Sequence, residues 1–232
     1  NPGYQPDYLK IYPCMVIPGT ELSDIHRAGG FETYDDETLE EVLYENMKSI
    51  PEWCRVDRVA RDIPAPDIES GSKVSNIRQV LEKRLESEGT PSRDIRSREI
   101  YKEDVNLDDI KLVVREYDAS AGKELFLAYE DTRKDKLVAL LRLRLSKGQF
   151  LKELKRAALI REVHVYGKQL AIGSKGKAKQ HVGWGSKLMS DAERLASNNG
   201  FARIAVIAGI GTREYYKKKG YALEGSYMLK DL

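Results

Sequence analysis

Three strand patterns follow one another without an intervening helix, and this run constrains the fold more than any other feature of the sequence. In order, the patterns cover residues 110–117, 124–129 and 137–145. Short turns join them, and such turns connect antiparallel strands, whereas parallel strands need a longer crossover. In the third pattern, leucines alternate strictly with Arg142 and Arg144, so we expect the leucines to face a core and the arginines the opposite side.

From a fourth strand onward, helices and strands alternate to the C-terminus. After the three strands we expect a strand at 159–166, a Gly/Lys-rich loop at 167–179, a helix at 184–199, a strand at 203–208, a helix at 212–219 and a final strand from Tyr221. Gly200 and Gly220 end the two helices, because glycine readily adopts the left-handed conformation of a helix C-terminus.

The N-terminal third has a different pattern, which is typical of parallel strands. Strands are predicted at 9–17 and 53–60, and helices at 38–50 and 75–88, the second with Ser75 as its N-cap. Two strand–helix units cannot close a barrel or cover both faces of a sheet. We therefore expect the end of a larger α/β domain, and the first residue, Asn1, suggests that the sequence begins inside a longer protein.

Charge is distributed unevenly along the chain, although the net charge is only +2. Residues 21–52 hold ten acidic and two basic side chains, whereas residues 142–203 hold fourteen basic and four acidic ones. The basic region favours a polyanionic partner, with solvated lysines as the simpler explanation of any single residue. No apolar run approaches the roughly 18 residues of a membrane-spanning helix, so we expect no membrane partner.

Cysteine usage points to a reducing compartment. Cys14 and Cys54 are the two cysteines of the chain, too few and too far apart for a zinc knuckle or a secreted disulfide scaffold. We therefore expect a cytoplasmic protein in which neither cysteine has a chemical role.

The strongest motif is Gln180-x-x-Gly183-x-Gly185, placed after a strand and before a helix. Glycines allow the backbone to approach a ligand closely, and the start of a helix offers unpaired N–H groups with a positive dipole. Such a turn binds pyrophosphate, although the same pattern also occurs as ordinary turn geometry. It is not the dinucleotide-binding fingerprint, because the third glycine is missing and the preceding strands are antiparallel.

In this context, the order of strands, motif and helices resembles the GNAT acetyltransferase superfamily. In that fold the fourth strand, here 161–166, diverges from the fifth, here 203–208. The resemblance implies that a tyrosine of the last helix lies near the sulfur of bound acetyl-CoA and donates a proton to the leaving thiolate. For this role we favour Tyr216 over Tyr215. The residues that it assigns to acetyl-CoA are Glu162, Val163, His164, Val165, Gln180, Val182, Gly183, Trp184, Gly185, Ser186 and Tyr216.

The sequence also resembles the family of Elongator catalytic subunits. The motifs that carry this resemblance are PDYLKIYP (6–13), RVARDIPA (58–65), SNIRQ (75–79), REVHVYG (161–167), VGWGSKLM (182–189), GTREYYKKKGY (211–221) and YMLKDL (227–232). The resemblance implies acetyl-CoA-dependent formation of 5-carboxymethyluridine at the tRNA wobble position. It also implies a radical-SAM barrel that holds a [4Fe-4S] cluster and S-adenosylmethionine.

This sequence departs from that family in two places. The three cysteines that hold the iron–sulfur cluster are absent, so we do not expect radical chemistry from this chain alone. Relatives also often carry C-x-C-x-x-C in the connector as part of a zinc site, where this chain has Ser92, Asp94 and Ser97. A serine hydroxyl is a poor zinc ligand beside a thiolate, so we expect no metal.

Together these observations predict an α/β (α+β) fold with three parts. Residues 1–91 are the remnant of a radical-SAM partial TIM barrel, residues 92–108 a charged connector, and residues 109–232 a GNAT acetyltransferase domain. Tyr216, Tyr215, Glu162 and His164 are the candidate catalytic residues, and Glu162 and His164 share one face of their strand by alternation. Other Elongator subunits or a second copy of the chain are further expected partners.

Basic residues in both halves are candidates for phosphate contacts with tRNA. They are Lys73, Arg78, Lys83, Arg84, Arg93, Arg96, Arg98, Arg142, Arg144, Lys152, Lys155 and Arg156. Two other functions remain open at this point: a protein lysine acetyltransferase, which an acidic groove would favour and the basic region argues against, and a tRNA-binding scaffold without catalysis.

Overall fold

The computed structural model describes residues 3–100, 106–166 and 183–232, which form two structural units. The N-terminal unit is Pro6–Ser97, and the C-terminal unit is Arg98–Leu232 together with Asn1–Gln5. The division lies inside the predicted connector, and the exact domain boundaries expected from the sequence stay predictions. Among the described residues, no helix combines the length and apolar character needed to cross a membrane.

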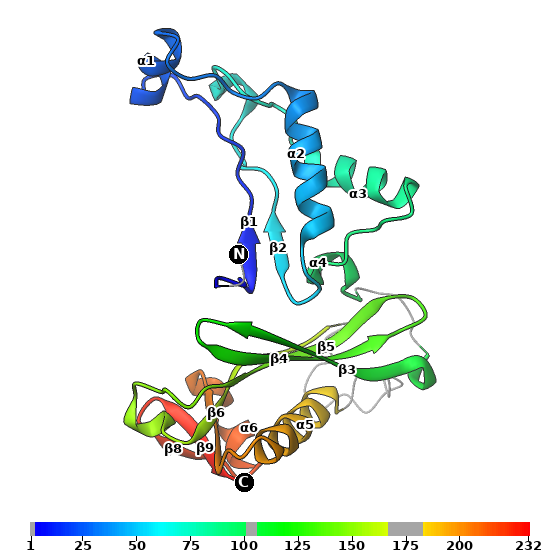
Figure 1. Ribbon diagram of the computed structural model, residues 1–232, viewed down its shortest axis with the longest axis vertical. Coiled ribbons are helices and arrows are strands. Elements are labelled where there is room, and N and C mark those ends of the chain that lie inside the picture. Colours follow the sequence, from blue (N-terminus) through cyan, green and yellow to red (C-terminus); the bar gives the residue numbers. More distant parts are fainter. Residues whose placement is uncertain (1–2, 101–105, 167–182) are drawn as a thin grey trace. The chain divides into compact units, whose positions relative to one another are not determined.

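The N-terminal unit is built from two short parallel strands and helices (Figure 1). In chain order its elements are β1 (Tyr8–Lys10), α1 (Glu21–Arg27), α2 (Asp36–Ser49), β2 (Arg55–Arg58), a 3-10 turn (Ala65–Asp67), α3 (Ile77–Ser87) and α4 (Ile95–Arg98), which reaches the unit boundary. The predicted parallel pairing is confirmed, since Tyr8 lies opposite Arg55 and Leu9 opposite Val56.

Two amphipathic helices form the core of this unit. The Asp35 carboxylate accepts a hydrogen bond from the Thr38 amide at 2.7 Å and caps α2. Leucines repeat at helical spacing, with Leu39 and Leu43 on α2 and Leu81 and Leu85 on α3, and all four are buried together. Each such side chain contributes roughly 1.5–3 kcal/mol through burial.

Several local predictions for this unit are wrong. The predicted strand at 9–17 extends only to Lys10, because Pro13 lacks an amide hydrogen; Val16 then forms a single bridge with Ser70. Asn76, not Ser75, is the residue before α3, and it makes no side-chain cap. Helix α1 was not predicted, although the Thr20 hydroxyl caps it by accepting from the Ser23 amide.

The C-terminal unit is a seven-stranded sheet with helices (Figure 1). Its elements are a 3-10 turn (Leu107–Asp109), β3 (Ile110–Ala119), β4 (Gly122–Asp131), β5 (Lys136–Leu145), a 3-10 turn (Lys152–Leu154), β6 (Ala157–Val165), α5 (Trp184–Asn198), β7 (Arg203–Ile207), a 3-10 turn (Ile210–Thr212), α6 (Arg213–Lys217), β8 (Ala222–Glu224) and β9 (Tyr227–Asp231). The strand order is β3-β4-β5-β6-β7-β9-β8, and the β6–β7 pair is parallel while the other pairs are antiparallel.

Helix α5 covers one face of this sheet (Figure 1). Its buried side chains, such as Leu188, Met189 and Ala192, pack against Leu141 and Leu143 of β5 in one apolar cluster. The alternation that placed the leucines toward a core is therefore confirmed. This packing fixes the N-terminus of α5 relative to the central strands.

Arg142, in contrast, is not a surface residue. Its side chain is 1% exposed, its Nε lies 2.8 Å from Glu162 Oε2, and its guanidinium lies over the Phe126 ring. This burial argues against the expectation that Arg142 contacts phosphate, because strand alternation shows which face a residue lies on but not whether that face is covered.

The predicted α/β fold class is confirmed. The order of elements from β3 to β9 is also the order that the acetyltransferase resemblance implies. The single strand predicted from Tyr221 is instead a hairpin of β8 and β9, which turns at Gly225 with a φ of 59°.

Candidate active site

Strands β6 and β7 pair along only part of their length. Residues Ala157 to Ile160 lie opposite Arg203 to Val206, whereas β6 continues beside β5 as far as the Ala139–Val165 pair. Among the described residues, the ladder between β6 and β7 ends at Ile160. The predicted divergence of these strands is confirmed, and the second half of β6 forms the edge of a candidate ligand site.

Two glycines shape the chain where α5 begins. Gly183 precedes the helix with a φ of 107°, a backbone conformation that residues other than glycine rarely adopt. A Cβ atom added to Gly185 would lie 3.6 Å from both Tyr215 Oη and Val165 Cγ2. The first turn of α5, the end of β6 and the hydroxyl of Tyr215 therefore converge at Gly185.

A lysine adds positive charge at this point. Lys219 Nζ donates a hydrogen bond to Ser186 Oγ at 2.8 Å and lies 5.0 Å from the centre of the Tyr215 ring. The positive end of the α5 dipole and the first-turn amides lie at the same place as this ammonium group. All three attract a negatively charged ligand. This corner of the C-terminal unit is suited to bind an anion.

The two adjacent tyrosines differ in their surroundings. Tyr215 is 42% exposed, whereas Tyr216 packs against the core, with ring centres 5.2 Å from Tyr215 and 5.8 Å from Tyr221. Burial, followed by the neighbouring Tyr215, raises the pKa of Tyr216 above its ordinary value. Tyr216 is therefore protonated at neutral pH and can donate a proton. The preference for Tyr216 over Tyr215 as catalytic residue stays a prediction.

Glu162 and His164 lie on the other face of β6 from the α5 core. Val163, between them, packs against that core, and strand alternation turns its neighbours away. The Glu162 carboxylate is held by buried Arg142, and His164 is exposed with its ring 4.3 Å from that of Tyr166. This placement favours a structural role for Glu162 over the predicted role of base.

We expect the substitution Glu162→Gln to lower the free energy of unfolding by about 3 kcal/mol, because it removes the carboxylate that lies 2.8 Å from the Nε of buried Arg142. Urea denaturation with an unchanged slope would measure this. Glu116→Gln is the matched control, since Glu116 pairs with Lys123 at the surface and should cost under about 1 kcal/mol. Equal losses in the two variants would contradict the structural role of Glu162.

Most residues predicted to contact tRNA are exposed, but two more, besides the buried Arg142, are not well placed for it. Arg98 is 2% exposed and pairs with Glu130, and Arg78 is 15% exposed and pairs with Glu82 and Asp94. Both arrangements argue against contact with an external phosphate. Arg144 and Arg84 are partly buried and bound to carboxylates, Arg144 to Glu124 and Arg84 to Glu40, Glu41 and Glu88.

The remaining candidates for phosphate contact lie at the surface. They are Lys73, Lys83, Arg93 and Arg96 in the N-terminal unit and Lys152, Lys155 and Arg156 in the C-terminal unit. Gln180, Val182 and the loop 167–179 lie outside the described residues.

Sequence reasoning missed a hollow of about 470 Å³ beside α5, lined by Tyr129, Ser186, Lys187, Ser190 and Asp191. Tyr129 donates to Asp191 Oδ2 at 2.7 Å, and burial together with this carboxylate raises the pKa of Tyr129 to about 12. The ammonium of Lys187 lies 4.2 Å from the Trp184 ring centre. Lys187 and Lys219 both lie close to the first turns of α5, and only helical spacing from the Gly183–Gly185 motif could have revealed Lys187.

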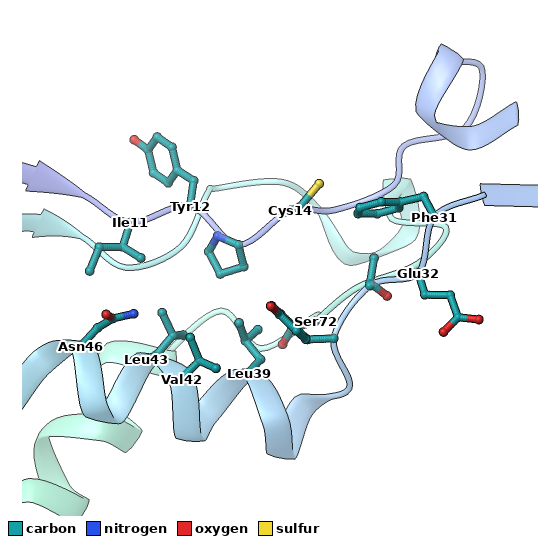
Figure 2. A pocket seen from close by; sticks show the side chains of 13 residues that line it. Ile11, Tyr12, Cys14, Phe31, Glu32, Leu39, Val42, Leu43, Asn46 and Ser72 are labelled. Carbon is teal, nitrogen blue, oxygen red and sulfur yellow. The ribbon is translucent and has the colours of Figure 1, made fainter. Parts of the chain in front are cut away.

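The N-terminal unit contains a separate groove of about 390 Å³ (Figure 2). Leu39, Val42 and Leu43 of α2 line it opposite Ile11, and Cys14 and Ser72 lie farther along it. Its lining is mainly apolar, and no predicted site residue lies in it.

Comparison with known proteins connects both units to one group of relatives. The model of the Radical_SAM C-terminal domain matches residues 6–87. Elongator complex protein 3 of Danio rerio is 42% identical over 240 residues, which cover 100% of this chain and 44% of that protein. The tRNA uridine(34) acetyltransferase of Methanocaldococcus infernus is 43% identical over 242 residues, 100% of this chain and 45% of that protein.

A solved structure agrees with these relatives. The archaeal Methanocaldococcus infernus Elp3 with an N-terminal deletion superposes with a TM-score of 0.89 at 41% identity, covering 100% of this chain and 57% of that one. The chain thus spans less than half the length of the two curated relatives.

Proposed function

This chain belongs to the Elongator complex protein 3 family along its whole length, and from this premise we propose that it binds acetyl-CoA at the start of α5. We further propose that it contributes thioester hydrolysis and tRNA contacts to the modification of the wobble uridine. The observation that carries the proposal is the convergence of the Tyr215 hydroxyl, Gly185 and Val165 where β6 has left β7.

The residues at this corner fit acetyl-CoA. Because Gly185 has no side chain, it leaves a space beside Tyr215 and Val165 that a larger residue would fill. The first-turn amides from Gly183 to Ser186 would donate hydrogen bonds to a pyrophosphate. Lys219 supplies a positive charge beside Ser186. The backbone of residues 162–165, at the edge where β6 has separated from β7, would hold the pantetheine arm.

Acetyl-CoA, when bound, supplies an activated thioester. Tyr216 holds a proton that its raised pKa keeps in place at neutral pH, and it would give that proton to a departing sulfur atom. Tyr215 places its hydroxyl at Gly185 and thereby positions the ligand. The packing of Tyr216 on Tyr221 keeps both rings of the pair in place.

An iron–sulfur cluster does not fit this chain. A site-differentiated cluster of the kind that the family resemblance implies needs three cysteine thiolates, and this chain has only Cys14, which is exposed, and Cys54, which is buried. No radical step, and no step with S-adenosylmethionine, is therefore assigned to these residues.

The experiment that tests the proposal measures thiol release from acetyl-CoA by the full chain, with and without tRNA. We expect release that depends on both the chain and tRNA. Binding of tRNA without thiol release would contradict the catalytic part and leave a binding scaffold, and transfer of the acetyl group to lysine-bearing peptides would indicate a protein acetyltransferase.

Salt dependence tests the proposed tRNA contacts. We expect the triple variant Lys152→Ala, Lys155→Ala, Arg156→Ala to reduce the slope of log affinity against log salt by about 2, since each lost phosphate contact removes roughly 0.7–0.9. The control triple variant removes Arg27, Lys48 and Arg58, whose charges are paired with Glu69, Glu45 and Asp62. Equal slopes for the two triple variants would contradict the assignment.

A further inference from the structure

The connector contains a fully buried carboxylate. Asp94 is 0% exposed, and five donors surround it. Its Oδ1 accepts from Arg78 Nη2 at 2.9 Å, Ser97 Oγ at 2.6 Å and Ser92 Oγ at 3.1 Å, and its Oδ2 accepts from the amides of Val56 at 3.1 Å and Arg96 at 3.2 Å. We call these six residues the Asp94 cluster.

Arg78 joins three elements through this cluster. From α3 it also donates through Nη1 to the Val56 carbonyl of β2 at 2.7 Å and through Nη2 to Ser97 Oγ at 3.0 Å. Its Nε lies 2.8 Å from Glu82 Oε1, which holds the guanidinium from the other side. The rigid fork of arginine suits several directed bonds at once, which a single ammonium could not reproduce.

The donor atoms do not fit the zinc ion that the family resemblance implies at these positions. Ser92 and Ser97 offer neutral hydroxyls and Asp94 offers one carboxylate, whereas zinc prefers thiolate and imidazole ligands. Within the part of the chain that the structure describes, no group of three or more His, Cys, Asp and Glu side chains could hold a metal ion. The position beside the carboxylate is occupied by the Arg78 guanidinium.

We propose that the Arg78 guanidinium provides the positive charge that a metal ion would otherwise supply to Asp94. Residues 92–97 then fold onto β2 and α3 without any metal ion. A carboxylate buried to this extent needs a compensating charge and a full set of donors. The guanidinium supplies the charge, and the two serines and two amides supply the remaining donors. Burial alone would raise the pKa of Asp94, but Arg78 and these donors outweigh it and hold the pKa below its usual value.

The first test is the metal dependence of the full chain. We expect less than about 0.1 zinc per chain after purification in zinc-containing medium, and a thermal midpoint that EDTA and added zinc leave unchanged. Zinc at one per chain, or a midpoint that falls in EDTA, would overturn the proposal.

The second test removes the guanidinium but keeps an aliphatic stem. Arg78→Met should lower the thermal midpoint of the N-terminal unit by roughly 10 °C or more, and zinc should not restore it. Lys83→Met, an exposed change on the same helix, should shift it by less than about 2 °C. A shift in Arg78→Met no larger than in Lys83→Met, or rescue by zinc, would overturn the proposal.

A milder variant keeps the proposal testable if Arg78→Met does not fold. Ser97→Ala removes one of the donors to Asp94 and should lower the midpoint by roughly 3–6 °C. Ser87→Ala is its control, because the Ser87 hydroxyl donates only to the Arg84 carbonyl at the surface. Equal midpoints for these two variants would mean that the cluster does not hold the connector.

Discussion

Replacing Tyr216 with phenylalanine is expected to lower tRNA-dependent hydrolysis of acetyl-CoA by roughly 100-fold or more, the usual contribution of a positioned proton donor. The ring remains, so its contacts with Tyr215 and Tyr221 and the packing on the core persist. The maximal rate should therefore fall while acetyl-CoA affinity stays within about twofold. Initial rates of thiol release at saturating acetyl-CoA and tRNA measure this effect.

Tyr215→Phe is the matched control. Because the Tyr215 hydroxyl lies at Gly185, its loss should raise the apparent KM more than it lowers the maximal rate. The pH profile gives a second readout: only protonated Tyr216 can donate, and burial raises its pKa above the ordinary value of a tyrosine, so this group should cause no loss of rate at neutral or mildly alkaline pH. A full rate in Tyr216→Phe, or the larger loss in Tyr215→Phe, would contradict the assignment.

Gly185→Asp should weaken acetyl-CoA binding by at least about 100-fold. The carboxylate would occupy the space beside Tyr215 and Val165, and it would repel the pyrophosphate at a distance where two like charges cost several kcal/mol. An acidic residue in the first turn of a helix is favourable for the helix itself, so α5 should fold normally. Titration calorimetry measures the affinity, and thermal unfolding checks the fold.

Gly185→Ala provides the comparison at the same position. The added Cβ would meet its neighbours at 3.6 Å, an ordinary contact, so we expect an affinity within about fivefold of that of the unaltered chain. An unchanged affinity in Gly185→Asp would place the acetyl-CoA site elsewhere.

Long periodic segments could be predicted from the sequence because their pattern reflects one covered face. The leucines of β5 and the apolar stripe of α5 are examples, and the separation of β6 from β7 followed from the family resemblance. Short elements were missed because their signal is weak. Helix α1 spans seven residues with Ser23 as its sole buried residue, and its start is marked by the Thr20 cap and the acidic Glu21 and Asp24.

Charged residues were the harder part of the site to predict. Arg78, Arg98 and Arg142 look like surface residues in the sequence, yet each is paired with a carboxylate distant in the chain or on another element. The same holds for Lys219, which reaches Ser186 across 33 positions of sequence. Local patterns carry no information on such pairs, because they depend on which strands and helices the fold brings together.

The central claim is that acetyl-CoA binds between the end of β6 and the start of α5, and amide chemical shifts test it most directly. Titration of the ¹⁵N-labelled chain with acetyl-CoA should shift the amides of Val163, Val165, Gly183, Gly185 and Ser186 at ligand concentrations well below millimolar. Amides of β1, β2 and α2 should stay unchanged. Shifts confined to Pro6–Ser97, or no shifts at millimolar acetyl-CoA, would contradict the account.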